Sequence, residues 1–193
     1  SIFDAIGHPD AHMDFAFENG SDALALTDHG NMNGLAGQVL HAKKMQAEGK
    51  DFKPIFGVEA YFIPSIEEWR EEYEAAMADK KRARSAKKDA ASGATVEDET
   101  DSKKLQGLLR RRRHLILLAQ NQTGLNNLFK LVSESYQSEN FYRYPRMDYA
   151  LLEKYGEGVI AASACLGGVY AGNYWENGIY DDEGNRTGVD REA

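Results

Sequence analysis

The most informative stretch of this chain is Ala23-Leu24-Ala25-Leu26-Thr27-Asp28-His29-Gly30-Asn31-Met32. Its apolar residues, 23–27, predict a short β-strand, and Gly30 predicts a turn directly after it. A carboxylate and an imidazole at the end of a strand are typical of a metal site. Because neighbouring strand residues point to opposite faces, Asp28 and His29 can reach one metal only if the strand has ended by Thr27.

A second apolar run, residues 54–62, carries the carboxylate of Glu59. An unpaired charge inside a buried strand is costly, and no basic residue is nearby in sequence. The alternative is a buried salt bridge with a distant residue. We therefore expect Glu59 to bind a cation.

Composition indicates one soluble domain. The chain has 193 residues, a formal net charge of −8 and a single cysteine, so it has no internal disulfide. No apolar run is long enough for a membrane span or a signal peptide, which predicts a cytoplasmic protein. The acidic balance argues against an autonomous nucleic-acid binder, but not against a DNA-acting domain whose carboxylates hold metal ions.

Strand-like and helical patterns alternate along the chain, which predicts a parallel α/β fold. Strands are expected at residues 23–27, 54–62, 115–119 and 158–162. Helices are expected at 9–19, ending at Asn19-Gly20, at 34–48, ending at Gly49, and at 123–136, beginning at Thr123.

Residues 66–113 break this alternation and predict a charged insertion, rich in Lys, Arg, Glu, Asp and Ala. Residues 67–88 predict a long exposed helix. Residues 89–102 lack apolar side chains to bury, which predicts a flexible or disordered segment. The insertion is either a solvated surface excursion or, through Arg110 to Arg113, a phosphate contact.

Several blocks, in a fixed order, resemble the PHP (polymerase and histidinol phosphatase) domain found in bacterial DNA polymerase III alpha subunits. They are residues 23–32, 54–62, 114–124, 127–133, 141–148 and 157–168. The resemblance implies a distorted β/α barrel with its site at the carboxyl ends of the strands. It also implies a multinuclear site for divalent zinc, manganese or magnesium ions.

The resemblance assigns the metal ligands residue by residue. His29 matches a direct ligand, Asp28 matches a ligand or a residue that orients one, and Asp4 matches the acidic residue after the family's first histidine motif. Glu59, His29 and Asp28 are the expected catalytic residues. Asp28 and Asp4 could instead cap helices.

His114 and Cys165 complete the expected ligand set. His114 precedes its strand, which would be the wrong end of an all-parallel barrel, so only the resemblance supports it. Cys165 follows its strand, and a thiolate suits zinc, although a buried free cysteine is the alternative. The other histidines, His8, His12 and His41, are expected to be surface residues.

Tyr142, Arg143 and Arg146 interleave aromatic and basic side chains, which is typical of a phosphate or DNA contact. The alternative is that Tyr142 packs on Arg146 while Arg146 forms a salt bridge.

Two family motifs are absent from residues 1–193. The opening histidine motif is expected just before Ser1 and a later Asp-x-His beyond Ala193, so the chain is interpreted as a partial PHP domain that is inactive in isolation. An intein inserted before Ser1 is one hypothesis for this start, because inteins favour active-site motifs and need Ser, Thr or Cys next. An incomplete gene fragment is the other.

Four functions follow from the resemblance. The favoured one is a fragment of a replicative DNA polymerase alpha subunit (a DNA-directed polymerase of DNA replication) with a metal-dependent phosphoesterase or 3′–5′ exonuclease site. Its partners would be DNA, the remaining polymerase domains, a proofreading exonuclease subunit and the sliding clamp. The alternatives are a non-catalytic scaffold that docks the proofreading exonuclease, a free-standing small-molecule phosphatase, and a polymerase X with a PHP appendage.

Overall fold

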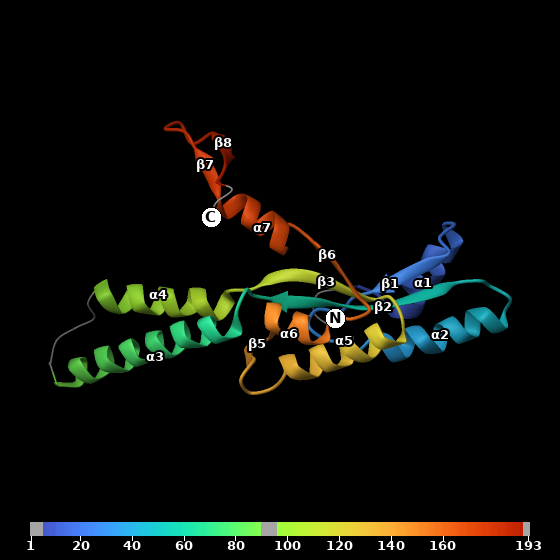
Figure 1. The fold of residues 1–193 in the computed structure, drawn as a ribbon, viewed down its shortest axis with the longest axis horizontal. Helices are drawn as coiled ribbons and strands as arrows, with labels where there is room; N and C mark the ends of the chain where they lie inside the picture. The colour runs from blue at the N-terminus through green and yellow to red at the C-terminus, as the bar shows by residue number, and fades with distance from the viewer. Residues whose placement is uncertain (1–5, 90–95, 191–193) are drawn as a thin grey trace.

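The computed structural model describes residues 6–89 and 96–190, which form a sheet with helices against it and projections at its ends (Figure 1). The helices are α1 (Pro9–Glu18), α2 (Leu35–Ala47), α3 (Ile66–Asp89), α4 (Val96–Arg110), α5 (Gln122–Ser135), α6 (Tyr149–Tyr155) and α7 (Val169–Glu176). The strands are β1 (Ala23–Leu26), β2 (Lys53–Phe62), β3 (Arg113–Ala119), β4 (Phe141–Tyr142), β5 (Tyr144–Met147), β6 (Val159–Ala162), β7 (Gly178–Tyr180) and β8 (Arg186–Val189). The four strands and three helices expected outside the insertion are confirmed to within two residues at each end.

Strand β2 is the centre of a six-stranded sheet with the order β4-β5-β2-β3-β6. On one side, β1 pairs in parallel with the first half of β2, and β5 pairs in parallel with its last two residues. On the other side, β3 runs antiparallel to β2, and β6 runs antiparallel to β3. The expectation of an all-parallel layout is therefore wrong. The reason is the helical excursion between β2 and β3, which returns the chain to the end of the sheet where β2 stopped.

The closed barrel expected from the family resemblance is not formed by the described residues, because the strand path from β4 to β6 is open. The structure shows an α/β fold whose sheet contains both parallel and antiparallel strands. Part of it is parallel, as in the β1–β2–β5 set.

Alternation along β2 divides the sheet into a core face and a site face. Val58, Ala60 and Phe62 are buried in a cluster that includes Leu128 and Leu131 of α5. Figure 1 shows α5 and α6 on this side of the sheet, whereas α7 extends from the other side. Successive strand residues point to opposite faces, so the side chains between the buried ones, including Glu59, lie on the face away from α5.

The residue that caps the start of helix α5 lies two positions before Thr123, where the sequence had placed the start of the helix. Its N-cap is Asn121, whose side-chain oxygen accepts a hydrogen bond of 2.9 Å from the Gly124 backbone N–H. Thr123 therefore lies inside the first turn. Asparagine is among the strongest N-capping residues, so this correction follows from ordinary capping chemistry.

Helices α3 and α4 lie side by side as a helical hairpin that projects from the end of the sheet (Figure 1). The two helices pack through Ala76, Leu105 and Leu108, and the Trp69 indole N–H donates to the Leu108 carbonyl at 2.8 Å. The helix expected at 67–88 is confirmed.

Residues 89–102 had been expected to be flexible or disordered, but the part of this segment that the structure describes is helical. Asp89 ends α3, and residues 96–102 form the first half of α4, while residues 90–95 lie outside the described residues. Helix formation is cooperative, so the helical turns anchored by Leu105 and Leu108 extend toward an amino-terminal half whose sequence is mostly polar.

His41 is not the surface residue that was expected. Its side chain is 11% exposed, and its Nε2 lies 2.8 Å from Oδ1 of Asp14, which joins α2 to α1. His8 and His12 are exposed, as expected. Within the described residues, no helix is long and apolar enough to cross a membrane.

The pair between Asp14 and His41 predicts a pH-dependent contribution to stability. The hydrogen bond from His41 lowers the pKa of Asp14 below its usual value. This contribution is fully present above the unfolded carboxyl pKa of about 3.9 and is lost as pH falls through the lower folded-state pKa. Asp14→Asn should therefore lower the Tm at pH 7, and the difference from the wild type should shrink in scans below pH 3. A difference that is constant across this range would contradict the pairing.

Candidate metal centre

The end of β1 brings His29 beside Glu59. Strand β1 stops at Leu26, as the site requires, but the parallel backbone pairing continues in an isolated bridge between His29 and Glu59. Glu59 N–H donates to the Asp28 carbonyl at 3.0 Å, and Gly30 N–H donates to the Glu59 carbonyl at 2.8 Å. Residues paired in this way direct their side chains to the same face. His29 Nε2 accordingly lies 3.3 Å from Glu59 Oε2.

The antiparallel strand β3 brings His114 to the same place. His114 pairs with Tyr61, two residues beyond Glu59, and its Nδ1 lies 2.7 Å from Glu59 Oε1. The position of His114 at the start of its strand had placed it at the wrong end of an all-parallel barrel. Because β3 runs antiparallel to β2, its first residues lie at the carboxyl end of β2, and the objection disappears.

The loop after β6 adds the thiol of Cys165. The backbone N–H of His114 donates to the Gly167 carbonyl at 3.0 Å, which fixes this loop against the start of β3. Cys165 Sγ lies 3.6 Å from His114 Nδ1 and accepts a hydrogen bond of 3.3 Å from the Gly167 N–H. Cys165 is exposed, so it is not the buried free cysteine of the alternative interpretation.

These donor atoms have the spacing of a zinc-like site. Atoms from His29, Glu59 and His114 all lie within 4.8 Å of one another. In a tetrahedral site, metal–N and metal–O bonds of about 2.0–2.1 Å separate two donors by about 3.3 Å, and a longer Zn–S bond of about 2.3 Å gives an N–S separation of about 3.6 Å. The His29–Glu59 and His114–Cys165 contacts match these values, whereas His114 and Glu59, at 2.7 Å, are at hydrogen-bond distance and would have to separate slightly around an ion. The donor set therefore fits a divalent metal ion.

The three nearest donors are accessible from solvent. The side chains of Glu59, His114 and His29 are 15%, 22% and 30% exposed, respectively. A small anionic group can therefore approach them from the face of the sheet that α5 does not cover.

The chain matches the PHP domain family over residues 1–182. It belongs to the PHP domain family. It is 37% identical over 169 residues to a protein of Aquifex aeolicus named DNA polymerase III subunit alpha, which covers 88% of this chain and 12% of that protein. It is 34% identical over 172 residues to the protein of the same name from Campylobacter jejuni, which covers 89% of this chain and 11% of that protein. The chain thus spans about a tenth of the length of these relatives.

Of the two other predicted ligands, Asp28 is not a member of this group and Asp4 lies outside the part of the chain that the structure describes. Asp28 Oδ2 accepts a hydrogen bond of 2.9 Å from the Gly34 N–H, the residue before α2, so it closes the turn that precedes this helix and is not a cap of the helix itself. Its carboxylate thereby holds the turn that carries His29.

Arg146 had been expected to contact phosphate or DNA, but the structure buries it. Its side chain is 0% exposed, and its guanidinium donates to the carbonyls of Leu109 and Tyr142 at 2.9 and 2.7 Å and stacks on the Trp69 ring at 4.2 Å. Burial lowers the pKa of Arg146 to about 10, with a smaller effect from Arg112, so it stays protonated at neutral pH. No carboxylate pairs with it among the described residues, so the alternative salt bridge is wrong as well.

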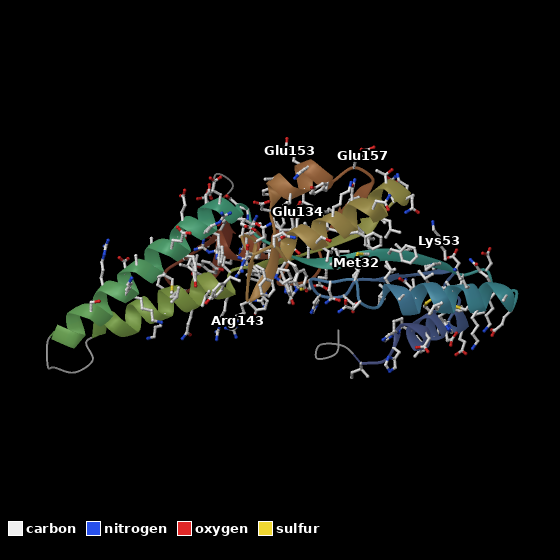
Figure 2. The ribbon with its side chains drawn as sticks, turned by 90° about the horizontal axis from the view of Figure 1, so that it is seen from below. Met32, Lys53, Glu134, Arg143, Glu153 and Glu157 are labelled. Carbon is white, nitrogen blue, oxygen red and sulfur yellow. The ribbon has the colours of Figure 1, made fainter. Side chains whose placement is uncertain are left out.

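The other two predicted contacts of that segment are exposed. Tyr142 packs against Tyr73 with their ring centroids 4.8 Å apart. Arg143 has a positive φ of 64°, and Figure 2 labels it where the α3–α4 hairpin meets the sheet. Both remain predictions as DNA contacts.

The sequence interpretation missed Tyr61 at this site and named Arg112 only as one of four consecutive arginines that could contact phosphate. The Tyr61 ring lies 6.2 Å from the His29 ring and 5.7 Å from the His114 ring, and the Arg112 guanidinium lies 5.3 Å from the Tyr61 ring. The alternation of strand residues could have found both, because residues two positions apart on a strand lie on the same face of the sheet. Tyr61 is two residues after Glu59, and Arg112 is two residues before His114.

Gly30→Ala should disturb the centre. Gly30 has φ +67°, and a Cβ there would lie 2.9 Å from Pro145 Cγ and 3.0 Å from Tyr61 Cε2. Both are ring atoms, so Tyr61 must move, and it contacts both imidazoles. Gly20→Ala is the matched control, because Gly20 has φ +85° with nothing within 4 Å. Both variants should lose about 1–2 kcal/mol of stability to the left-handed backbone, but only Gly30→Ala should also weaken zinc binding in a titration. Equal zinc affinity in the two variants would contradict this role.

Proposed function

We propose that this PHP domain holds a metal-dependent phosphoesterase site that removes nucleotides from the 3′ ends of single-stranded DNA, within a replicative DNA polymerase alpha subunit. One observation carries the proposal. The two oxygens of the Glu59 carboxylate contact the imidazoles of His29 and His114, and the Cys165 thiol lies beside His114. The names of the relatives favour DNA over a small phosphate ester as the substrate.

Divalent zinc, manganese or magnesium ions bound here would supply Lewis acidity, which activates water and neutralises phosphoryl oxygens. The residues of the chain do the positioning. Glu59 sets the orientation of both imidazoles by contacting one nitrogen of each, and Asp28 holds the turn of His29 through the Gly34 N–H. The thiol of Cys165 adds a soft donor, which favours zinc over magnesium.

The partners follow from the proposed polymerase context. They are DNA, the remaining polymerase domains, a proofreading exonuclease subunit and the sliding clamp, in the cytoplasm. A non-catalytic scaffold is the second candidate, because the α7 region exposes large apolar side chains, including Leu166 at 81% and Tyr170 at 76%. Such surfaces typically mark contact with another protein surface.

The test uses the full-length polypeptide that carries this chain and a single-stranded oligonucleotide labelled at its 5′ end. With manganese or zinc we expect stepwise shortening from the 3′ end, and a chelator should stop it. Restoration by added metal should follow. Shortening that continues in the chelator, or that never occurs with any of the three metals, would contradict the proposal and favour the scaffold.

A further inference from the structure

We propose that Arg112 is a specificity-determining residue of this site, which binds the phosphate next to the reacting phosphodiester in single-stranded DNA. The inference rests on the proposed function. It concerns a residue outside the expected ligand set, at the point where the α3–α4 hairpin joins β3.

The geometry of the sheet places Arg112 on the face of the metal centre. Arg112 is two residues before His114, and His114 pairs with Tyr61 across β2 and β3. The Arg112 guanidinium carbon lies 4.0 Å from the Tyr144 ring centroid and 5.3 Å from that of Tyr61. The two rings contact each other with centroids 5.2 Å apart. The guanidinium is thus held by two aromatic rings, which lowers the entropy cost of using it to bind a ligand.

Tyr61 separates this guanidinium from the metal ligands. The Tyr61 ring contacts Arg112 and also the rings of His29 and His114. An anion bound to Arg112 is therefore next to the metal centre but not in it. Successive phosphates of one strand have the same relationship, with one nucleotide between them.

Charge pairing distinguishes Arg112 from its neighbour in the arginine run. Arg111 forms a two-point contact with Glu72, at 2.8 and 2.9 Å. Among the described side chains, Arg112 has no carboxylate partner, and its Nη1 donates a hydrogen bond of 3.0 Å to the Arg110 carbonyl. The positive charge of Arg112 also faces that of Arg146, whose pKa it helps to lower.

A phosphate is the ligand that this arrangement fits best. The planar guanidinium can donate two parallel hydrogen bonds to phosphate oxygens, and a bound anion would relieve the repulsion between Arg112 and Arg146. A substrate with only one phosphate cannot use this contact. Arg112 should therefore select oligonucleotides over simple phosphodiesters.

The test compares two substrates of the full-length polypeptide with manganese. Bis(p-nitrophenyl) phosphate has one phosphate, and a thymidine trinucleotide has two. Arg112→Ala should raise the KM for the trinucleotide about 10- to 100-fold, the effect of losing a hydrogen bond to a charged group, and should raise the KM for bis(p-nitrophenyl) phosphate far less. Arg112→Lys should recover part of the loss, because it keeps the charge without the planar fork.

Arg110→Ala is the matched control, since Arg110 is exposed in the same run and its carbonyl remains. Arg110→Ala should change the KM of neither substrate. Equal losses on both substrates in Arg112→Ala, or no loss on either, would overturn the proposal.

A binding measurement separates failure of the proposed function from failure of the role of Arg112. If the wild type hydrolyses neither substrate, anisotropy of a fluorescent trinucleotide still reports the contact. The slope of log K against log salt should then fall by about 0.7 in Arg112→Ala, the value for one phosphate contact on a single strand. An unchanged slope would overturn the role of Arg112 independently of catalysis.

Discussion

Glu59→Gln should reduce metal-dependent hydrolysis of single-stranded DNA more than 100-fold while leaving the fold intact. The carboxylate contacts both imidazoles, so its loss removes one donor and the residue that orients two others. Loss of a group that only orients metal ligands already lowers metal affinity or activity about 10- to 100-fold. Loss of Glu59, which is a donor and also contacts two other donors, should lower activity more. The substitution preserves side-chain volume, so circular dichroism and thermal unfolding should match the wild type. His29→Ala should have a similar effect on activity.

The matched control is Glu153→Gln. Glu153 is exposed on α6, and Figure 2 shows it at the outer edge of the molecule. Activity should be unchanged in this variant. If the wild type and Glu59→Gln hydrolyse DNA at the same rate, the activity belongs to another site or to a contaminant, and the scaffold function takes first place.

Arg146→Met should destabilise the fold by about 3 kcal/mol or more, because each buried carbonyl left without a donor costs about 1–3 kcal/mol. The guanidinium satisfies carbonyls of Leu109, Arg111 and Tyr142, and so joins the end of α4 to β4. Methionine has a similar length but cannot donate. Urea unfolding should show a lower midpoint with an unchanged slope.

Arg143→Met is the control for this substitution. Arg143 is exposed and three residues away, so its replacement should change the free energy of unfolding by less than about 0.5 kcal/mol. Similar destabilisation by the two variants would contradict the assignment of Arg146 as the buried connection between the hairpin and the sheet.

The local structure was largely predictable from the sequence. The apolar runs gave the strands β1, β2, β3 and β6, and the glycines after α1 and α2 marked the ends of those helices, where Gly20 and Gly49 have positive φ. These signals are local, since they depend on side-chain period and on backbone conformations that glycine adopts easily. The polar half of α4 was missed because its helix is propagated from apolar residues further along the chain.

The candidate metal centre was predictable only in part. Residue chemistry and the family resemblance identified His29, Glu59, His114 and Cys165. The structure groups the first three and places Cys165 beside His114. The same signals misassigned Arg146, because an arginine beside aromatic residues has the same sequence pattern whether it binds a phosphate or fills the core.

The sequence by itself determined the strands β1, β2, β3 and β6, the helices α1, α2, α3 and α5, and the donor types, since period, turn residues and an isolated carboxylate act over a few residues. Only the tertiary structure decided strand direction and burial. The antiparallel course of β3 places His114 on Glu59, and packing against Trp69 encloses Arg146 while Arg112 stays at the edge of the site. Both outcomes depend on contacts between residues far apart in the chain, 55 positions for Glu59 and His114 and 77 for Trp69 and Arg146, which no local pattern encodes.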